Sequence, residues 1–185
     1  MSNAVSALQG ALYKGYCTVE EAGLVGMITL RGDLSSDAIA KAVKAATGAE
    51  MPGQGKMTEG KKGRAGWMSP DELLLIVDHA AAPKVVEAAS KSLADEHSLI
   101  VNVSDARAVF RVKGAACREV IAKLSPADTA VMQPGMLRRT RVAQIPAAFY
   151  LEDDQTAVLV CFRSVAQYAF DLLADAARGG GEVGV

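Results

Sequence analysis

The chain has 185 residues, of which 50% are hydrophobic, and its 20 basic and 21 acidic residues give a formal net charge of −1. Proteins that bind nucleic acid or adhere to membrane surfaces by charge need a basic excess, so this balance argues against both classes. No stretch approaches the roughly 20 apolar residues of a membrane helix, and the N-terminus lacks the pattern of a secretory signal. We therefore expect a cytoplasmic protein that binds neither nucleic acid nor membrane.

The cysteines and histidines are few and widely spaced. The three cysteines, Cys17, Cys117 and Cys161, form an odd set, which is untypical of a disulfide framework. The two histidines, His79 and His97, do not stand at metal-ligand spacing from each other or from a cysteine. We expect buried, unreactive thiols, surface histidines and no metal site.

The first half of the chain predicts an irregular lead-in followed by alternating strands and helices. Residues 1–23 show no clear period and are expected to form an N-terminal arm. The elements expected next are a strand at 25–31, a helix capped by Ser35 or Ser36 and ended by Gly48, a long mobile surface loop at 48–66, a strand at 73–77 and a helix from Pro83 to Leu93.

The second half predicts a similar succession of elements. They are a strand at 99–103, an alternating strand at 107–113, a helix between Gly114 and Ser125-Pro126, strands near 136–145, 147–152 and 157–162, and a last helix from about Ser164. The glycine-rich residues 179–185 are expected to form a flexible tail.

The order of these elements indicates an internal repeat. ITLRGD (Ile28–Asp33) and VFRVKG (Val109–Gly114) each lead into a helix containing an Ile-Ala-Lys or similar sequence, with an offset of about 82 residues. Each half alone has too small a core to be stable. We therefore predict an α/β (α+β) domain at 24–178, built from two βαββα-like pseudo-repeats at about 24–97 and 98–178 that pack as one body.

Several short patterns carry chemistry elsewhere but have simpler interpretations here. Gly55, Gly60 and Lys61 have the spacing of a phosphate-binding loop, but Lys62 replaces the required Ser or Thr and no strand precedes the motif. We interpret this stretch as a solvated lysine loop. The paired acids Asp71-Glu72 and Asp153-Asp154 are interpreted as hairpin turns rather than as acid/base pairs. No other set of residues predicts an active site.

Arg138, Arg139 and Arg141 form the densest basic cluster in the predicted fold. In a strand, Arg139 and Arg141 share one face. Two interpretations remain open: a solvated strand edge that discourages aggregation, or a face that meets carboxylates of a partner or an anionic ligand. We favour the partner interface.

Four stretches together resemble the gamma subunit family of heterotetrameric sarcosine oxidase. They are Ile28–Leu34, Gly66-Trp67 with Leu73–Ile76, Ala108–Asp128, and Gly135-x-x-x-Arg139-Thr140 with Val160–Ser164. They span about residues 24–178, and their order makes the resemblance more specific than any one of them.

The resemblance implies a fold similar to the folate-binding domain of the glycine-cleavage aminomethyltransferase. It also implies a complex with alpha, beta and delta subunits that oxidatively demethylates sarcosine to glycine with H2O2 and formaldehyde or 5,10-methylenetetrahydrofolate. In such a complex FAD, FMN, NAD, zinc and tetrahydrofolate are expected outside this chain. The resemblance carries no catalytic, cofactor-binding or metal-binding residue onto this sequence, and the isolated chain is expected to be inactive.

Alternative functions remain open from the sequence. The related N-methylglutamate dehydrogenase has corresponding subunits, and the four stretches do not separate the two complexes. A stand-alone tetrahydrofolate-binding protein is a second alternative, which would need a pocket with polar groups for the pterin. A nucleotide-dependent enzyme would rest on the defective glycine loop alone.

Overall fold

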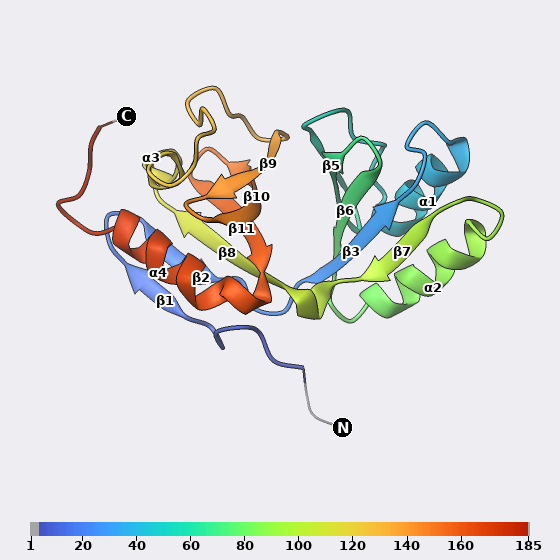
Figure 1. Ribbon diagram of the computed structural model, residues 1–185, viewed down its shortest axis with the longest axis horizontal. Helices are drawn as coiled ribbons and strands as arrows, with labels where there is room; N and C mark the ends of the chain where they lie inside the picture. Colours follow the sequence, from blue (N-terminus) through green and yellow to red (C-terminus); the bar gives the residue numbers. More distant parts are fainter. Residues whose placement is uncertain (1–3, 185) are drawn as a thin grey trace. The chain divides into compact units, whose positions relative to one another are not determined.

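The computed structural model describes residues 4–184 and divides them into two units (Figure 1). The first unit combines the N-terminal residues up to Leu24 with residues from Ala106 onwards, and the second unit is Val25–Asp105. The second unit is thus inserted between two pieces of the first. Residues 98–105 belong to the inserted unit, so the boundary between units lies later than the expected boundary between pseudo-repeats.

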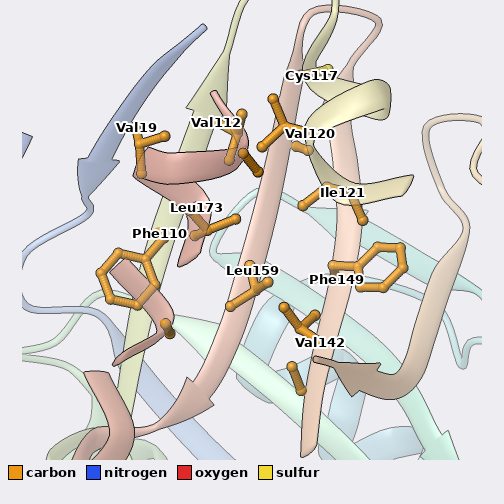
Figure 2. Packing of buried hydrophobic residues seen from close by; sticks show 14 of the residues in the cluster. Val19, Phe110, Val112, Cys117, Val120, Ile121, Val142, Phe149, Leu159 and Leu173 are labelled. Atoms are coloured by element: carbon orange, nitrogen blue, oxygen red, sulfur yellow. The ribbon is translucent and has the colours of Figure 1, made fainter. Parts of the chain in front are cut away.

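The first unit contains a six-stranded antiparallel sheet in the order β1-β2-β8-β11-β10-β9. Its strands are β1 (Leu12–Lys14), β2 (Thr18–Glu21), β8 (Arg107–Lys113), β9 (Leu137–Val142), β10 (Ile145–Asp153) and β11 (Thr156–Phe162), and its helices are α3 (Cys117–Ala122) and α4 (Ala166–Ala176). Both helices cover one face of the sheet. Figure 2 shows their buried residues, such as Val120, Ile121 and Leu173, meeting Phe110 and Leu159 of the strands.

The second unit contains a five-stranded antiparallel sheet in the order β4-β5-β6-β3-β7. Its strands are β3 (Gly26–Arg31), β4 (Met57–Gly60), β5 (Gly63–Ser69), β6 (Glu72–Val77) and β7 (Leu99–Asn102), and its helices are α1 (Asp37–Thr47) and α2 (Ala82–Ser92). Alternate residues of β3 and β6, including Ile28, Leu30 and Leu75, pack against Ile39 and Val43 of α1.

The strand orders of the two sheets support the predicted duplication. Read from β9, the first sheet runs β9-β10-β11-β8, and the second runs β4-β5-β6-β3 in the same relative chain order. Each unit therefore has a βαβββα succession, with one more strand than the expected βαββα pattern. The repeated glycines Gly32 and Gly114 follow β3 and β8, at φ 159° and 144°. A Cβ on either would lie within 3 Å of a side-chain atom, of Ile39 and Cys17 respectively, which explains the glycine at both places.

Three expectations about irregular segments require correction. Within the expected arm at 1–23, β1 and β2 form a hairpin that extends the first sheet along β8, while residues 1–3 lie outside the described residues. Within the expected loop at 48–66, β4 and the start of β5 form a second hairpin. In the expected tail, residues 181–184 make hydrogen bonds to the first unit, and residue 185 is outside the described part. The first and third segments depend on partners distant in sequence. In the second, glycines and lysines obscure the pattern of a local hairpin.

Candidate subunit interface

The arginine cluster lies on β9, which forms one edge of the six-stranded sheet. Among residues 4–184, only β10 pairs with it. A two-residue turn that contains Ala143 in the left-handed region, at φ 48°, joins the two strands. This tight connection fixes the register and hence the face on which each arginine lies.

The register separates the three arginines between two faces. Arg139 is opposite Ala148, and Arg141 is opposite Pro146, so both lie on the face away from the α3–α4 layer. Both are exposed. Arg138 is opposite Phe149 on the helix-covered face, where it is half-buried and its guanidinium donates to the carbonyl of Leu137 at 3.1 Å. The prediction that Arg139 and Arg141 share a face is therefore confirmed by the geometry.

The glycine–lysine stretch is a hairpin and not a phosphate-binding loop. Lys61 and Lys62 form its turn, and the backbone N–H of Lys62 donates to the carbonyl of Thr47 at 3.0 Å. A Cβ on Gly60 would come within 2.2 Å of the carbonyl carbon of Gly48, so this glycine permits close contact with the end of α1. Gly60 therefore serves packing, and the motif is followed by strand β5 and not by a helix that could receive a phosphate.

The three cysteines are buried in the first unit and are not disulfide-bonded. Burial raises the pKa of all three thiols, that of Cys161 to about 11. A thiol that stays protonated at neutral pH is a poor nucleophile and a poor metal ligand. The expectation of unreactive thiols is therefore supported by their surroundings.

The paired acids occupy the hairpin turns expected for them. Asp71 lies in the turn between β5 and β6, and Glu72 begins β6. A hydrogen bond from the Ser69 hydroxyl, followed by one from the Arg31 guanidinium, lowers the pKa of the Asp71 carboxyl. Asp153 ends β10, and Asp154 follows it in the turn to β11. Within residues 4–184, no three His, Cys, Asp or Glu side chains lie close enough together to hold a metal ion.

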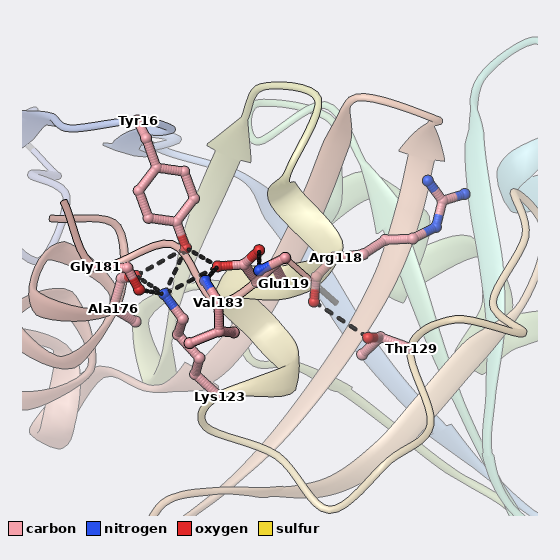
Figure 3. A network of polar contacts seen from close by, with 9 residues as sticks. Tyr16, Arg118, Glu119, Lys123, Thr129, Ala176, Gly181 and Val183 are labelled. Atoms are coloured by element: carbon pink, nitrogen blue, oxygen red, sulfur yellow. Dashed lines mark hydrogen bonds and ion pairs between the residues drawn. The ribbon is translucent and has the colours of Figure 1, made fainter. Parts of the chain in front are cut away.

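Sequence reasoning missed a buried carboxylate on α3, which binds the C-terminal residues (Figure 3). The side chain of Glu119 is only 4% exposed and accepts the N–H groups of Val183 and Gly184 at 2.9 and 3.0 Å. Lys123 is 3.1 Å from the same carboxylate, and the Tyr16 hydroxyl donates to it at 3.2 Å. The Val183 N–H has the largest effect on this group. With Lys123 and the Gly184 N–H, it lowers the pKa of Glu119 to about 2 against the opposing effect of burial.

Lys123 connects this carboxylate to the rest of the C-terminal segment. Its ammonium group donates to the carbonyls of Ala176 and Gly181 at 3.1 and 2.6 Å and to the Tyr16 hydroxyl at 2.9 Å. The i,i+4 spacing of Glu119 and Lys123 was a visible signal of an ion pair. The other partners of Lys123 are the Tyr16 side chain and two backbone carbonyls, all more than 50 residues away, and the sequence offers no signal for these contacts.

A second carboxylate, Glu21 at the end of β2, holds the N-terminal segment. Its oxygens accept the N–H groups of Leu8 and Gly10 at 2.8 and 2.7 Å and the Ser6 hydroxyl at 2.9 Å. Burial alone would raise the pKa of Glu21, but these hydrogen bonds outweigh it and lower the pKa. Both ends of the chain are thus attached to the first unit through carboxylates with lowered pKa values.

Comparison with known proteins identifies the family. The chain matches the sarcosine oxidase, gamma subunit family over residues 31–179. It belongs to this family. Sarcosine oxidase subunit gamma of Corynebacterium sp. (strain U-96) is 28% identical over 163 residues, which cover 86% of this chain and 78% of that protein. The resemblance inferred from the four sequence stretches is therefore confirmed.

Solved structures with the same fold agree with this assignment. The gamma-family chain is similar to a chain of heterotetrameric sarcosine oxidase from Corynebacterium sp. U-96 in complex with pyrrole 2-carboxylate. The TM-score is 0.78 at 24% identity, over 90% of this chain and 87% of that one. The glycine cleavage system aminomethyltransferase T from Bartonella henselae has a TM-score of 0.66 at 9% identity, over 86% of this chain and 45% of that one. The expected fold class is thus confirmed.

The helices of this family member are short. No helix among residues 4–184 combines the length and the apolar character needed to cross a membrane.

Proposed function

We propose that this chain is the non-catalytic gamma subunit of a heterotetrameric sarcosine oxidase, together with alpha, beta and delta subunits. Membership of the gamma subunit family over residues 31–179 carries the proposal. In it, the complex oxidatively demethylates sarcosine to glycine, with H2O2 and formaldehyde or 5,10-methylenetetrahydrofolate as the other products. We place the complex in the cytoplasm, which agrees with three unpaired cysteines.

The chemistry of the described residues supports a role outside catalysis. The thiols have raised pKa values, and the paired acids are turn residues with structural partners. The carboxylates with lowered pKa values, Glu21 and Glu119, are occupied by the chain's own backbone. We therefore assign FAD, FMN, NAD, zinc and tetrahydrofolate to the partner subunits.

We assign the exposed arginines of β9 to a partner interface. Arg139 and Arg141 project from the same face of an edge strand, in the fixed register described above. Two guanidinium groups at i and i+2 on a strand lie roughly 7 Å apart along the chain, a spacing that suits two carboxylates on a partner surface. In this arrangement the charges discourage unspecific strand pairing and also select an acidic partner.

The overall assignment is tested by reconstitution. The chain purified alone should form no sarcosine-dependent peroxide, whereas co-expression with candidate alpha, beta and delta chains should yield one complex that does. Assays with N-methylglutamate in place of sarcosine distinguish the related dehydrogenase. Turnover by the isolated chain, or its failure to join the complex, contradicts the proposal.

The arginine interface is tested by charge reversal. Arg139→Glu combined with Arg141→Glu should weaken assembly by about tenfold or more, because each lost charge pair leaves a carboxylate facing another. Lys41→Glu on α1, an exposed residue of the other unit, serves as the control. Association is measured by titration of the variants against the remaining subunits. Equal affinity for all variants would show that the arginines do not contact a partner and only protect the strand edge.

A further inference from the structure

The edges of the two sheets differ in how well they are protected against pairing with another strand. β9 carries three arginines, β1 has only three residues and includes Lys14, and β4 contains Glu59 next to Gly60. The remaining edge, β7, reads Leu99-Ile100-Val101-Asn102. It contains no charge and no proline, and its register along β3 is regular. Native proteins usually shorten, charge, bend or cover such an edge, because its unpaired N–H and C=O groups can pair with another chain.

The hydrogen-bond register shows which backbone groups of β7 face outward. The N–H of Val103 donates to the carbonyl of Met27 at 2.8 Å, which marks this pair as a bonded position of the ladder with β3. Bonded and non-bonded positions alternate along an antiparallel ladder, so Val101 is the next residue bonded to β3. The N–H and C=O groups of Ile100 and Asn102 therefore point to the open side.

The side chains of Leu99, Ile100 and Val101 alternate between the two faces of the sheet. Ile100 packs against the core of the second unit. Leu99 and Val101 lie on the other face, where they are 52% and 40% exposed. Exposed carboxylates, Asp95 and Asp105, flank the strand on both sides in sequence.

We propose that β7 accepts an added strand from another subunit of the complex. The added segment is extended, pairs through its backbone with Ile100 and Asn102, and places apolar side chains beside Leu99 and Val101. Lysine or arginine residues at its ends match the flanking carboxylates. This inference rests on the proposed function, because the partner is a subunit of the same complex, and it involves a different unit of the chain from the arginines of β9.

The size of the edge favours a partner subunit over a second copy of this chain. Only two residues of β7 offer outward backbone groups, which allows about four hydrogen bonds to an added strand. Two copies joined through so short a ladder would bury far less than the roughly 1,200 Å² typical of a stable interface. Strand addition at β7 therefore suits one part of a larger contact.

Two kinds of variant test the proposal in the full chain. Val101→Lys and Leu99→Lys place a charge beside the edge without touching the ladder with β3, since both side chains are exposed. Ile100→Pro removes an N–H that faces outward, a backbone change that edge strands tolerate, and it also takes the Ile100 side chain out of the core. Val131→Lys replaces a 57% exposed valine outside any strand and is the matched control. Melting temperatures establish that each variant is folded.

The affinity of each variant for the assembled alpha, beta and delta chains is then measured. We expect the β7 variants to bind about tenfold or more weakly and the Val131→Lys variant to bind within about twofold of the unchanged chain. Unchanged affinity of the folded β7 variants would overturn the proposal. If the unchanged chain fails to bind at all, the proposed function fails instead.

Hydrogen exchange on the unmodified protein gives an independent result. The amides of Ile100 and Asn102 should exchange quickly in the isolated chain and become protected in the complex, because an added strand would occupy them. Absence of this protection contradicts the proposal even if a variant does not fold. Protection that instead grows with the concentration of the isolated chain would point to a second copy and would equally overturn it.

Discussion

At the scale of single residues, two glutamates explain how the chain's ends are held. Glu21 and Glu119 are nearly buried, and each accepts two backbone N–H groups from a terminal segment. A buried carboxylate is costly unless it is fully hydrogen-bonded, so these contacts are required for the carboxylates as much as for the segments. The hydrogen bonds stabilise the charged form of each carboxylate and thereby lower its pKa.

The Glu119 contact predicts a dependence of stability on acid. Its pKa is about 2 in the folded chain against 4.5 for an ordinary glutamate. A depressed pKa gives a stabilising contribution that is fully present above the unfolded value and is lost as the pH falls from about 4.5 towards 2. Glu119→Gln should therefore lower stability at neutral pH and make the decrease below pH 4.5 shallower.

The measurement is urea unfolding between pH 7 and pH 2.5 for the unchanged chain and two variants. Glu182→Gln is the control, because that exposed carboxylate lies in the same C-terminal segment. The free energy of unfolding of this variant should fall with decreasing pH as steeply as that of the unchanged chain. An unchanged slope in Glu119→Gln would show that the carboxylate does not have this role.

Gly60 gives a second prediction at this scale. A Cβ there would overlap the backbone of Gly48 at 2.2 Å, and neither backbone can move without disturbing the hairpin or the end of α1. Gly60→Ala should lower the free energy of unfolding by roughly 1–3 kcal/mol. Gly53→Ala, where the nearest atom is 4.0 Å away at the flexible Lys56 side chain, should have little effect. Chemical denaturation distinguishes the two, and equal stabilities would contradict the close contact.

At the scale of elements, the sequence predicts an element well when its stabilising contacts are local and poorly when its partner lies far along the chain. Helix α1 begins after Ser36 and ends before Gly48 as predicted, because both caps are local. β2 was missed because its pairing partner β8 lies more than 80 residues later. β4 and the start of β5 were predicted as a loop because glycines and lysines interrupt the apolar pattern of this hairpin, in which β4 pairs with β5 and only β5 pairs with β6.

The candidate interface shows the same division. Strand alternation alone placed Arg139 and Arg141 on one face, and the register with β10 agrees. Alternation could not show that β9 is an edge strand, since that depends on the order of the sheet. The sequence could not predict the role of Glu119 either, because two of its hydrogen-bond donors are backbone N–H groups of the C-terminal segment.

The cap of α1 gives a prediction at the element scale. The Ser36 hydroxyl oxygen accepts the N–H of Ala38 at 3.2 Å, and the hydroxyl donates to Glu96 at 3.0 Å. Ser36→Ala should cost about 1 kcal/mol, the usual effect of losing an N-cap. Ser90→Ala on the exposed side of α2 should be neutral or slightly stabilising, because alanine is the better helix former. Thermal unfolding measures the stability of both variants. An unchanged melting temperature for Ser36→Ala would show that the helix does not need its cap.

At the scale of the whole molecule, the N-terminal residues complete the sheet and the core of the first unit. β2 contributes Val19, which is fully buried, and Cys17 just before it is 1% exposed. The sheet edge that β2 covers is β8, a central strand of the core. The N-terminal segment is therefore a structural part of the unit and not an appendage.

Truncation tests this statement. Removal of residues 1–22 takes away β1, β2 and the Glu21 contacts, and the lost burial should lower the melting temperature by roughly 10 °C or more. Removal of residues 1–10 takes away the donors to Glu21 but keeps both strands, so it should have a smaller effect than removal of residues 1–22. Calorimetry of the two truncated chains gives the comparison, and a full-sized effect from the shorter deletion would show that the strands themselves contribute little.

The insertion of one unit within the other has a consequence for biosynthesis. The ribosome makes β2 before all of the Val25–Asp105 unit and β8 only after it. At a synthesis rate of about 5–20 residues per second, several seconds pass between the synthesis of β2 and that of its pairing partner β8. The strands of the central unit are contiguous in sequence and can pair with one another during that interval. Chaperones that bind nascent chains would thus encounter an N-terminal hairpin whose partner strand β8 has not yet been made.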